Sequence, residues 1–305
     1  MEKTTEEMRR EDFDILKWRE ENPMDYIKAM ELIVSASNKE DVFRWIYEIT
    51  RLYIPDVLFK YGSLTGDPEK DKIRFDTLKQ EKVYLSTIDG FNDPFDSKAY
   101  FYRSEELMKY ERLQHCGGRI IDDFARFFRV ACFTANGINS MPMWAHYASN
   151  HTGYCVSYDM NHEENLRLRA CMMPVQYTAQ RVDVTNLMDY QMGKILAGIE
   201  EGIKKQTKEI WYDDLSLIFL SVFFVNLKHR SWNYEKEFRC SMGANAPWSE
   251  YCKAKPQAIY IGAKCAEKNR EQLIDIGKKL SIPVYQMTYD DYSADYSLLA
   301  EKVEM

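Results

Sequence analysis

The order of apolar and polar residues divides the chain into a helical beginning and a longer mixed part. In the first 53 residues, apolar side chains recur every three or four positions, as they do on one face of a helix. Asn22 and Pro23 suit the start of one helix, and Asn38 suits the start of another. The buried stripes are predicted to be Ile27, Met30, Ile33 and Val34, then Val42, Trp45, Ile46 and Ile49. We therefore expect an N-terminal helical extension over residues 1–55.

From residue 56 onward, short β-rich runs alternate with helical stretches, without a strict βαβ order. Strands are expected at 57–61, 82–87, 97–101, 130–134, 154–159, 173–178, 229–242 and 258–265, with 283–289 as the last strand. Helices are expected at 72–80, 104–115, 119–128, 162–170, 185–227 (one or two) and 267–280. This pattern predicts an α+β fold: a mixed, mainly antiparallel sheet core with helical insertions, in a single domain over residues 56–305.

Composition narrows the classes of function. With a net charge of -7, the surface as a whole does not attract nucleic acid or an anionic membrane, although a local basic patch still can. The seven cysteines are spread singly, and the first residues are too polar for a signal peptide, so we expect reduced thiols and a cytoplasmic location. The most apolar run, 215–227, is too short to span a bilayer, and no membrane partner is expected.

The segment MWAHYASNHTGY contains two of the five histidines, His146 and His151. Residues five apart on a regular helix point about 140° from each other, so the two rings cannot share a metal ion unless the helix ends between them. Asn150 and Gly153 suit such an end. One interpretation is a helix that buries Trp144 and Tyr147 while the histidines cap or form hydrogen bonds. A functional role for at least one histidine agrees equally with the pattern. A zinc site is the least favoured interpretation.

The segment GFNDPFDS predicts a turn, because the residue before a proline is pushed toward extended backbone and Asn or Asp can bond the backbone two residues on. Asn92, Asp93 and Asp96 supply side-chain oxygens that suit a cation or a ribose. A rigid turn that caps itself explains the same residues without a ligand, and it is the favoured interpretation.

The segment SWNYEKEFRC, taken as part of a strand, has one largely apolar and one polar face because side chains alternate along a strand. The polar face is predicted to carry Asn233, Glu235, Glu237 and Arg239. Two carboxylates about 6.6–7 Å apart in Cα position suit acid–base chemistry or a ribose hydroxyl. A basic run that suits a phosphate comes just before: Lys228, His229 and Arg230. A solvated strand face with cross-strand ion pairs is the favoured alternative on spacing alone.

Together these segments resemble the bacterial family known as domain of unknown function 2971. This sequence carries LFKY at 58–61, FNDPFD at 91–96, MWAHYASNHTG at 143–153, WNYEKEFR at 232–239 and AIYIG at 258–262. The resemblance spans about residues 57 to 290 and leaves the N-terminal helices outside it. Membership of this family does not fix an activity.

A more distant resemblance is to the ADP-ribosyltransferases, and it implies NAD as a substrate. In that arrangement Lys60 or Tyr61 on the early strand would bind NAD, and Tyr147, helped by His146, would pack around nicotinamide. Glu237 would hold the ribose and stabilise the transition state, and Glu235 would orient the acceptor. Further cofactor-binding residues are then Asn92, Asp93 and Arg239. The chain departs from that superfamily in having no arginine or histidine on the first strand and no Ser-Thr-Ser triplet.

Three classes of function stay open. The first is ADP-ribosyl transfer or NAD cleavage in bacterial defence, such as phage defence, or in toxin biology. The second is a metal-dependent hydrolase that uses His146, His151 and the acids of FNDPFD. The third is a non-catalytic nucleotide-sensing or interaction module. We expect a small nucleotide ligand and no metal, and the sequence does not say whether an acceptor is protein or nucleic acid. The motifs are expected to meet in one cleft, since each combines polar groups with aromatic residues.

Overall fold

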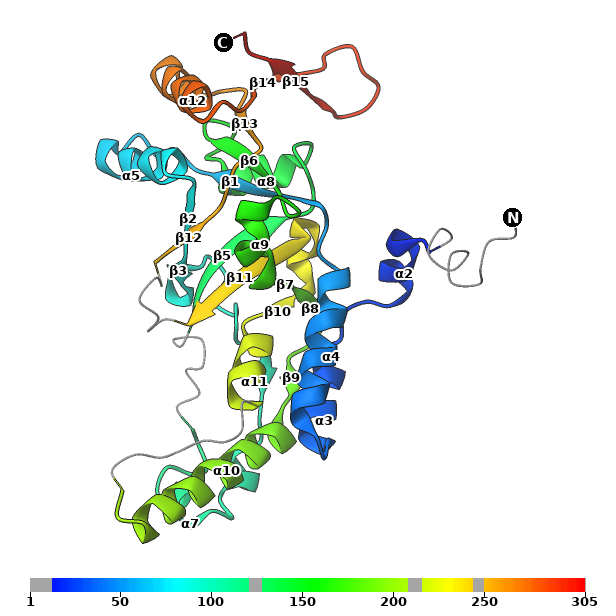
Figure 1. The fold of residues 1–305 in the computed structure, drawn as a ribbon, viewed down its shortest axis with the longest axis vertical. Coiled ribbons are helices and arrows are strands. Elements are labelled where there is room, and N and C mark those ends of the chain that lie inside the picture. The colour runs from blue at the N-terminus through cyan, green and yellow to red at the C-terminus, as the bar shows by residue number, and fades with distance from the viewer. Residues whose placement is uncertain (1–12, 121–127, 208–215, 244–249, 305) are drawn as a thin grey trace.

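The computed structural model describes residues 13–120, 128–207, 216–243 and 250–304. Figure 1 shows an elongated molecule with helices at both ends of its long axis and a sheet between them. Nine strands of the described chain form the main sheet, in the order β15-β14-β13-β6-β1-β5-β11-β7, with β3 paired to β5. Their bounds are β1 Val57–Gly62, β3 Ser86–Thr87, β5 Phe128–Thr134, β6 Tyr154–Asp159, β7 Met172–Pro174, β11 Glu237–Gly243, β13 Ala258–Ile261, β14 Val284–Tyr289 and β15 Leu298–Lys302.

The main sheet is mixed and mostly antiparallel. The pair β13–β14 is parallel, whereas β1, β5, β6 and β11 pair with one another or with their other neighbours in antiparallel register. Central strands are covered on both faces and therefore read as apolar runs: five of the six residues of β6 are buried. The predicted α+β class, with a mixed and mainly antiparallel sheet, is confirmed.

Three short two-stranded sheets stand beside the main one. They are β2 (Lys82–Tyr84) with β12 (Tyr251–Lys253), β4 (Tyr100–Phe101) with β9 (Val182–Asp183), and β8 (Gln176–Thr178) with β10 (Leu227–His229). The predicted strand at 82–87 is thus divided between β2 and β3. A strand that the sequence analysis did not predict, β15, follows β14 and forms the edge of the main sheet.

The helices begin where the sequence supplies caps. The carboxylate of Asp67 accepts hydrogen bonds from the backbone of Glu69 and Lys70 at the start of α5, where Pro68 also fits the first turn. The described helices are α2 Ile15–Glu21, α3 Tyr26–Ser35, α4 Lys39–Leu52, α5 Pro68–Lys79, α6 Ser104–Leu107, α7 Glu111–Gln114, α8 Met141–Tyr147, α9 Leu166–Ala170, α10 Thr185–Lys204, α11 Ser216–Phe224 and α12 Glu267–Leu280. None of them is long and apolar enough to cross a membrane.

Two hydrophobic clusters form most of the interior. One lies against the sheet and includes Leu58, Phe133, Val156 and Leu273. The other joins the N-terminal helices to later helices and includes Tyr26, Met30, Ile33 and Phe223. The ring of Tyr26 stacks on Phe223 with centroids 5.0 Å apart, and its hydroxyl donates to the carbonyl oxygen of Pro174 at 2.6 Å. The helical extension therefore shares a core with the rest of the chain, while its division from residues 56–305 as a separate unit stays a prediction.

Several details of the N-terminal helices differ from expectation. The first predicted helix begins at Tyr26 rather than after Asn22, because the carboxylate of Asp25 accepts from two backbone N–H groups and caps it. Asn38 caps α4 as predicted. Trp45 is 55% exposed, and Phe43 lies in the core instead.

Two further helical predictions fall partly outside the described residues. The segment expected as one or two helices over 185–227 holds α10 and α11, with residues 208–215 outside the described part. Most of the helix expected at 119–128 also lies outside the described residues.

Replacing Tyr26 with alanine should lower the free energy of unfolding by about 3–5 kcal/mol, because it empties a fully buried site and removes a hydrogen bond. Trp45→Ala on the neighbouring helix should change it by less than about 0.5 kcal/mol. Urea denaturation followed by circular dichroism measures both. Equal effects of the two substitutions would contradict the packing of α3 on the later helices.

Candidate functional site

A cavity of about 890 Å³ opens beside β1, β5 and β11, and the predicted motifs meet in it. Its lining includes Phe59, Lys60, Tyr61, Asn92, Asp96, His146, Tyr147, Glu235 and Glu237. Strand register explains the meeting: Glu237 of β11 pairs with Thr134 of β5, which pairs with Phe59 of β1. One row across three strands thus joins segments that lie far apart in the sequence. Two of the predicted site residues, Asp93 and Arg239, do not line the cavity.

The expected strand over 229–242 is wrong in its first half. A 3₁₀ helix, η4 (Arg230–Glu235), leads to Lys236 in the left-handed region with φ 43°, and β11 begins only at Glu237. Side-chain donors hold this turn: Thr134 Oγ1 donates to the carbonyl oxygen of Glu235 at 2.5 Å, and Asn136 donates to that of Tyr234. Despite the turn, the side chains of Glu235 and Glu237 still point toward the same partner.

The favoured alternative, a solvated strand face, is wrong for three of the four residues of the polar face: Glu235, Glu237 and Arg239 are buried, and Asn233 is exposed. Arg239 is fully buried, and its guanidinium uses all five N–H groups. It binds Asp96 with two bonds of 2.7 Å, Glu237 with bonds of 2.8 and 3.0 Å, and the carbonyl oxygen of Val225 at 2.6 Å. Bidentate pairs of this kind are strong and fix geometry. Arg239 therefore positions the cluster and does not reach a ligand.

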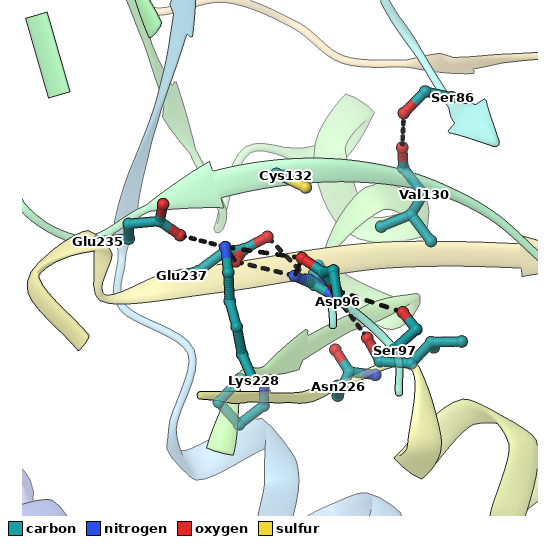
Figure 2. Close-up of polar contacts among 12 residues, drawn as sticks. Ser86, Asp96, Ser97, Val130, Cys132, Asn226, Lys228, Glu235 and Glu237 are labelled. Atoms are coloured by element: carbon teal, nitrogen blue, oxygen red, sulfur yellow. Dashed lines mark hydrogen bonds and ion pairs between the residues drawn. The ribbon is translucent and has the colours of Figure 1, made fainter. Parts of the chain in front are cut away.

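Lys228 also has a different role from the one predicted. It rises from β10, and its Nζ lies 2.5 Å from Glu235 Oε2, 3.0 Å from Glu237 Oε2 and 3.7 Å from Asp96 Oδ2 (Figure 2). Its side chain is buried, so it neutralises carboxylates rather than meeting a phosphate. The other members of the predicted basic run, His229 and Arg230, are exposed. A lysine directly after the apolar run of α11 was the signal in the sequence that a buried carboxylate must face it.

The buried cluster holds one more carboxylate than it holds cations in ion-pair contact. Asp96, Glu235 and Glu237 face Lys228 and Arg239, and the two glutamates differ in consequence. Burial and the charge of Glu237 raise the pKa of Glu235. Burial acts on Glu237 in the same direction, but Arg239 and Lys228 outweigh it and bring the pKa of Glu237 well below its ordinary value. Two neighbouring carboxylates with opposite shifts are typical of acid–base sites.

Tyr147 connects α8 to this cluster. Its hydroxyl donates to Glu235 Oε1, and burial followed by that bond raises the pKa of the phenol. His146 is exposed at the cavity, with its ring 6.4 Å from Tyr147 and 6.2 Å from Tyr234 between centroids. Glu235, Tyr147 and His146 thus form one wall of the cavity.

His151 lies apart from that wall. Helix α8 ends at Tyr147, and His151 follows with φ 70° and stacks on Trp144 at 5.9 Å between centroids. Burial and the charge of Lys264 lower its pKa. No group of three or more His, Cys, Asp and Glu side chains in the described ranges is arranged to hold a metal ion.

The early strand contributes one cation and one packing residue. Lys60 Nζ donates to the carbonyl oxygen of Cys132 at 3.0 Å, and burial lowers the pKa of Lys60. Tyr61 is buried, donates to the carbonyl oxygen of Gly137 at 2.7 Å and meets Trp144 edge-on. Lys60 is therefore the better candidate of the two for contact with a ligand.

The polar residues of the 90–97 turn have different roles: two hold the protein together, and one is exposed at the cavity. Asp93 caps the turn by accepting from the backbone of Phe95 at 2.9 Å, as the favoured interpretation expected. Both carboxylate oxygens of Asp96 accept hydrogen bonds from Arg239, so Asp96 serves as a partner of this guanidinium and not as a ligand of a bound metal ion. Asn92 is exposed at the cavity beside Tyr147 and remains a candidate for ligand contact.

Glu235→Gln and Glu237→Gln should change stability in opposite directions at neutral pH. Burial and the charge of Glu237 raise the pKa of Glu235, so its ionised form costs free energy in the folded protein, and glutamine should raise the free energy of unfolding. The lowered pKa of Glu237 means the reverse, and glutamine there should destabilise by about 3–5 kcal/mol. Urea denaturation at pH 7.5 measures both. The gain from Glu235→Gln should shrink at pH 5, and effects of equal sign would contradict the assignment.

The matched family covers the centre of the site. The model of the family described as a protein of unknown function (DUF2971) matches residues 143–240, which include most of α8, Lys228 and both glutamates. Comparison with curated proteins and with solved structures gives no significant match. The resemblance to ADP-ribosyltransferases is not confirmed and stays a prediction. Over residues 143–240 the chain resembles the DUF2971 family, which confirms that part of the predicted span of about 57 to 290.

Proposed function

We propose that the cavity binds NAD and that the site cleaves the bond between nicotinamide and ribose. The observation that carries this proposal is the buried cluster that opens to the cavity at Glu235, in which three carboxylates have only two cations in ion-pair contact. A ligand with a positive charge at that position compensates the excess carboxylate. NAD carries such a charge on its pyridinium ring, and the charge moves to the ribose as the glycosidic bond breaks.

The rest of the cavity agrees with a dinucleotide. Its volume of about 890 Å³ lies within the range of ligand pockets. Aromatic side chains, among them Phe59 and Phe91, offer surfaces on which a base can stack. Lys60 and Arg74 line the same space and suit the diphosphate.

The chemistry can be written with these groups. The C1′–N bond breaks, nicotinamide leaves with the electron pair, and the ribosyl cation is stabilised by the carboxylate of Glu235. Water or a nucleophilic acceptor then forms the new bond to C1′ and gives its proton to Glu235. Glu237 stays ionised because Arg239 and Lys228 hold it, and so it keeps the charge of the cluster fixed. Tyr147 orients Glu235 through its hydroxyl.

Binding without turnover is a second candidate function. Both glutamate side chains are almost fully buried, at 2% and 5% exposure, which favours a sensor of a cationic nucleotide over a site that must admit water. The two functions differ in one measurable product, free nicotinamide.

The purified protein should release nicotinamide from NAD, and Glu235→Gln should reduce the rate by about 10²–10⁴-fold. Glu48→Gln, an exposed position on α4, is the matched control and should leave the rate unchanged. Chromatography of the products measures nicotinamide, with calorimetry of NAD binding in parallel. Binding of NAD without release of nicotinamide supports the sensor. If the protein neither binds NAD nor releases nicotinamide, both functions are refuted.

The rate should fall toward acid with a midpoint above the ordinary glutamate pKa of 4.5, since the ionised form of Glu235 acts and its pKa is raised. Tyr147→Phe removes a hydrogen bond that lowers this pKa, so the acid limb should move to higher pH. Profiles of kcat/KM against pH measure both effects. An acid limb that stays in place in Tyr147→Phe would assign it to another group.

A further inference from the structure

A two-stranded ribbon at the rim of the cavity presents aromatic and basic side chains on one face. In the β2–β12 pair, Tyr84 is opposite Tyr251, and Lys82 is opposite Lys253. Because side chains alternate along strands, these four share a face, and the intervening Val83 and Cys252 are buried on the other. Tyr84 is 47% exposed and Tyr251 is 38% exposed. Figure 1 shows the two strands running together near α5.

The ring surfaces of this face are open to a planar ligand. The centroids of Tyr84 and Tyr251 lie 5.5 Å apart with 62° between their planes, so the rings meet edge to face. An edge-to-face pair leaves the outer face of a ring free for stacking, and the π-face of a nucleobase fits it without sequence preference.

The ribbon is continuous with the cavity already described. Lys82, Tyr84 and Tyr251 belong to its lining, together with Lys70 and Arg74 of α5. Along β5, the residue paired with Ser86 is four positions from the residue paired with Glu237. At the rise of a strand, the distance along β5 between the partners of Ser86, two residues after Tyr84, and of Glu237 is about 13 Å. A nucleic-acid strand bound on the ribbon can therefore extend toward the two glutamates.

The positive charge at the rim is modest. Lys82 bonds the amide oxygen of Gln80 at 3.1 Å, and Lys70 makes an exposed contact of 3.5 Å with Asp67, which contributes little. Lys253 pairs with Glu164. Two lysines can therefore meet phosphates, too few to attract a duplex to a chain of net charge -7.

We propose that the β2–β12 ribbon binds single-stranded nucleic acid, with a base stacked on Tyr84 or Tyr251 and the adjoining phosphates on Lys82 and Lys70. A flat face of rings and lysines offers what a single strand needs: surfaces for stacked bases and positive charges for the adjoining phosphates. That the bound strand is the acceptor of an ADP-ribosyl group rests on the function proposed above; the binding itself does not.

Fluorescence anisotropy with labelled 12-nucleotide DNA and RNA strands, single and duplex, tests the proposal. Single strands should bind at least about tenfold more tightly than duplex. Two phosphate contacts predict a slope of log K against log salt of about -1.4. Comparison of the DNA and RNA strands identifies which backbone is preferred. No binding of any strand, as expected if the ribbon serves a protein partner, overturns the proposal, and so does equal binding of duplex.

Paired substitutions locate the binding. Tyr84→Ala with Tyr251→Ala should weaken single-strand binding about tenfold or more, because each stacked base contributes about 1–3 kcal/mol. The pair Tyr84→Phe and Tyr251→Phe keeps the rings and should retain binding. Tyr292→Ala with Tyr296→Ala removes two tyrosines that are 100% and 97% exposed away from the ribbon, and should have no effect.

Equal loss of single-strand binding in all three double variants refutes the assignment of the binding site to the ribbon. So does unchanged binding in the double variant Tyr84→Ala, Tyr251→Ala, provided that its melting temperature is also unchanged. Glu235→Gln should bind single strands as the unmodified protein does. This separates failure of the ribbon proposal from failure of the NAD proposal.

Discussion

The architecture of the site depends on one buried guanidinium. Arg239 has no exposed surface, and its five N–H groups bond to three parts of the chain: β11 itself, the 90–97 turn and the end of α11. An unpaired charge at this position costs several kcal/mol, so the stability of the fold depends on Asp96 and Glu237 as partners of Arg239. The turn and the sheet are thereby fixed relative to each other, and the cavity lies between them.

The cluster combines a rigid and an adjustable carboxylate. Glu237 has two cations against it and keeps its charge, whereas Glu235 shares Lys228 and takes its other bond from a phenol. The cost of holding Glu235 ionised is a loss of stability that a simple core would avoid. Natural proteins accept such costs where the group has a task, which is the physical reason for placing the function at Glu235.

Part of the fold and of the candidate site could be predicted from the sequence. The pattern of apolar and polar residues predicted α12 at its observed bounds and the position of most strands, because local rules decide those elements. The clustering of LFKY, FNDPFD, MWAHY and YEKEFR was expected from their shared character and is seen in the cavity. Strand alternation failed at Glu235, since the turn at Lys236 depends on donors from Thr134 and Asn136, about 100 residues away. Lys228 was assigned to a phosphate. Its place after an apolar run indicated burial, but the identity of its partners depends on a strand register that no local pattern encodes.

Lys236 has a consequence for how the motif can vary. It lies between the two glutamates in the left-handed region, with φ 43°. Its backbone conformation determines how the helical turn that ends at Glu235 is oriented relative to the strand that begins at Glu237. Glycine and asparagine adopt that conformation readily, whereas β-branched residues do not. The middle position of Glu-x-Glu is therefore restricted to residues that can adopt the left-handed conformation, although the motif itself specifies no residue there. Sequences with valine, isoleucine or threonine there would carry both acids and still present them in a different geometry.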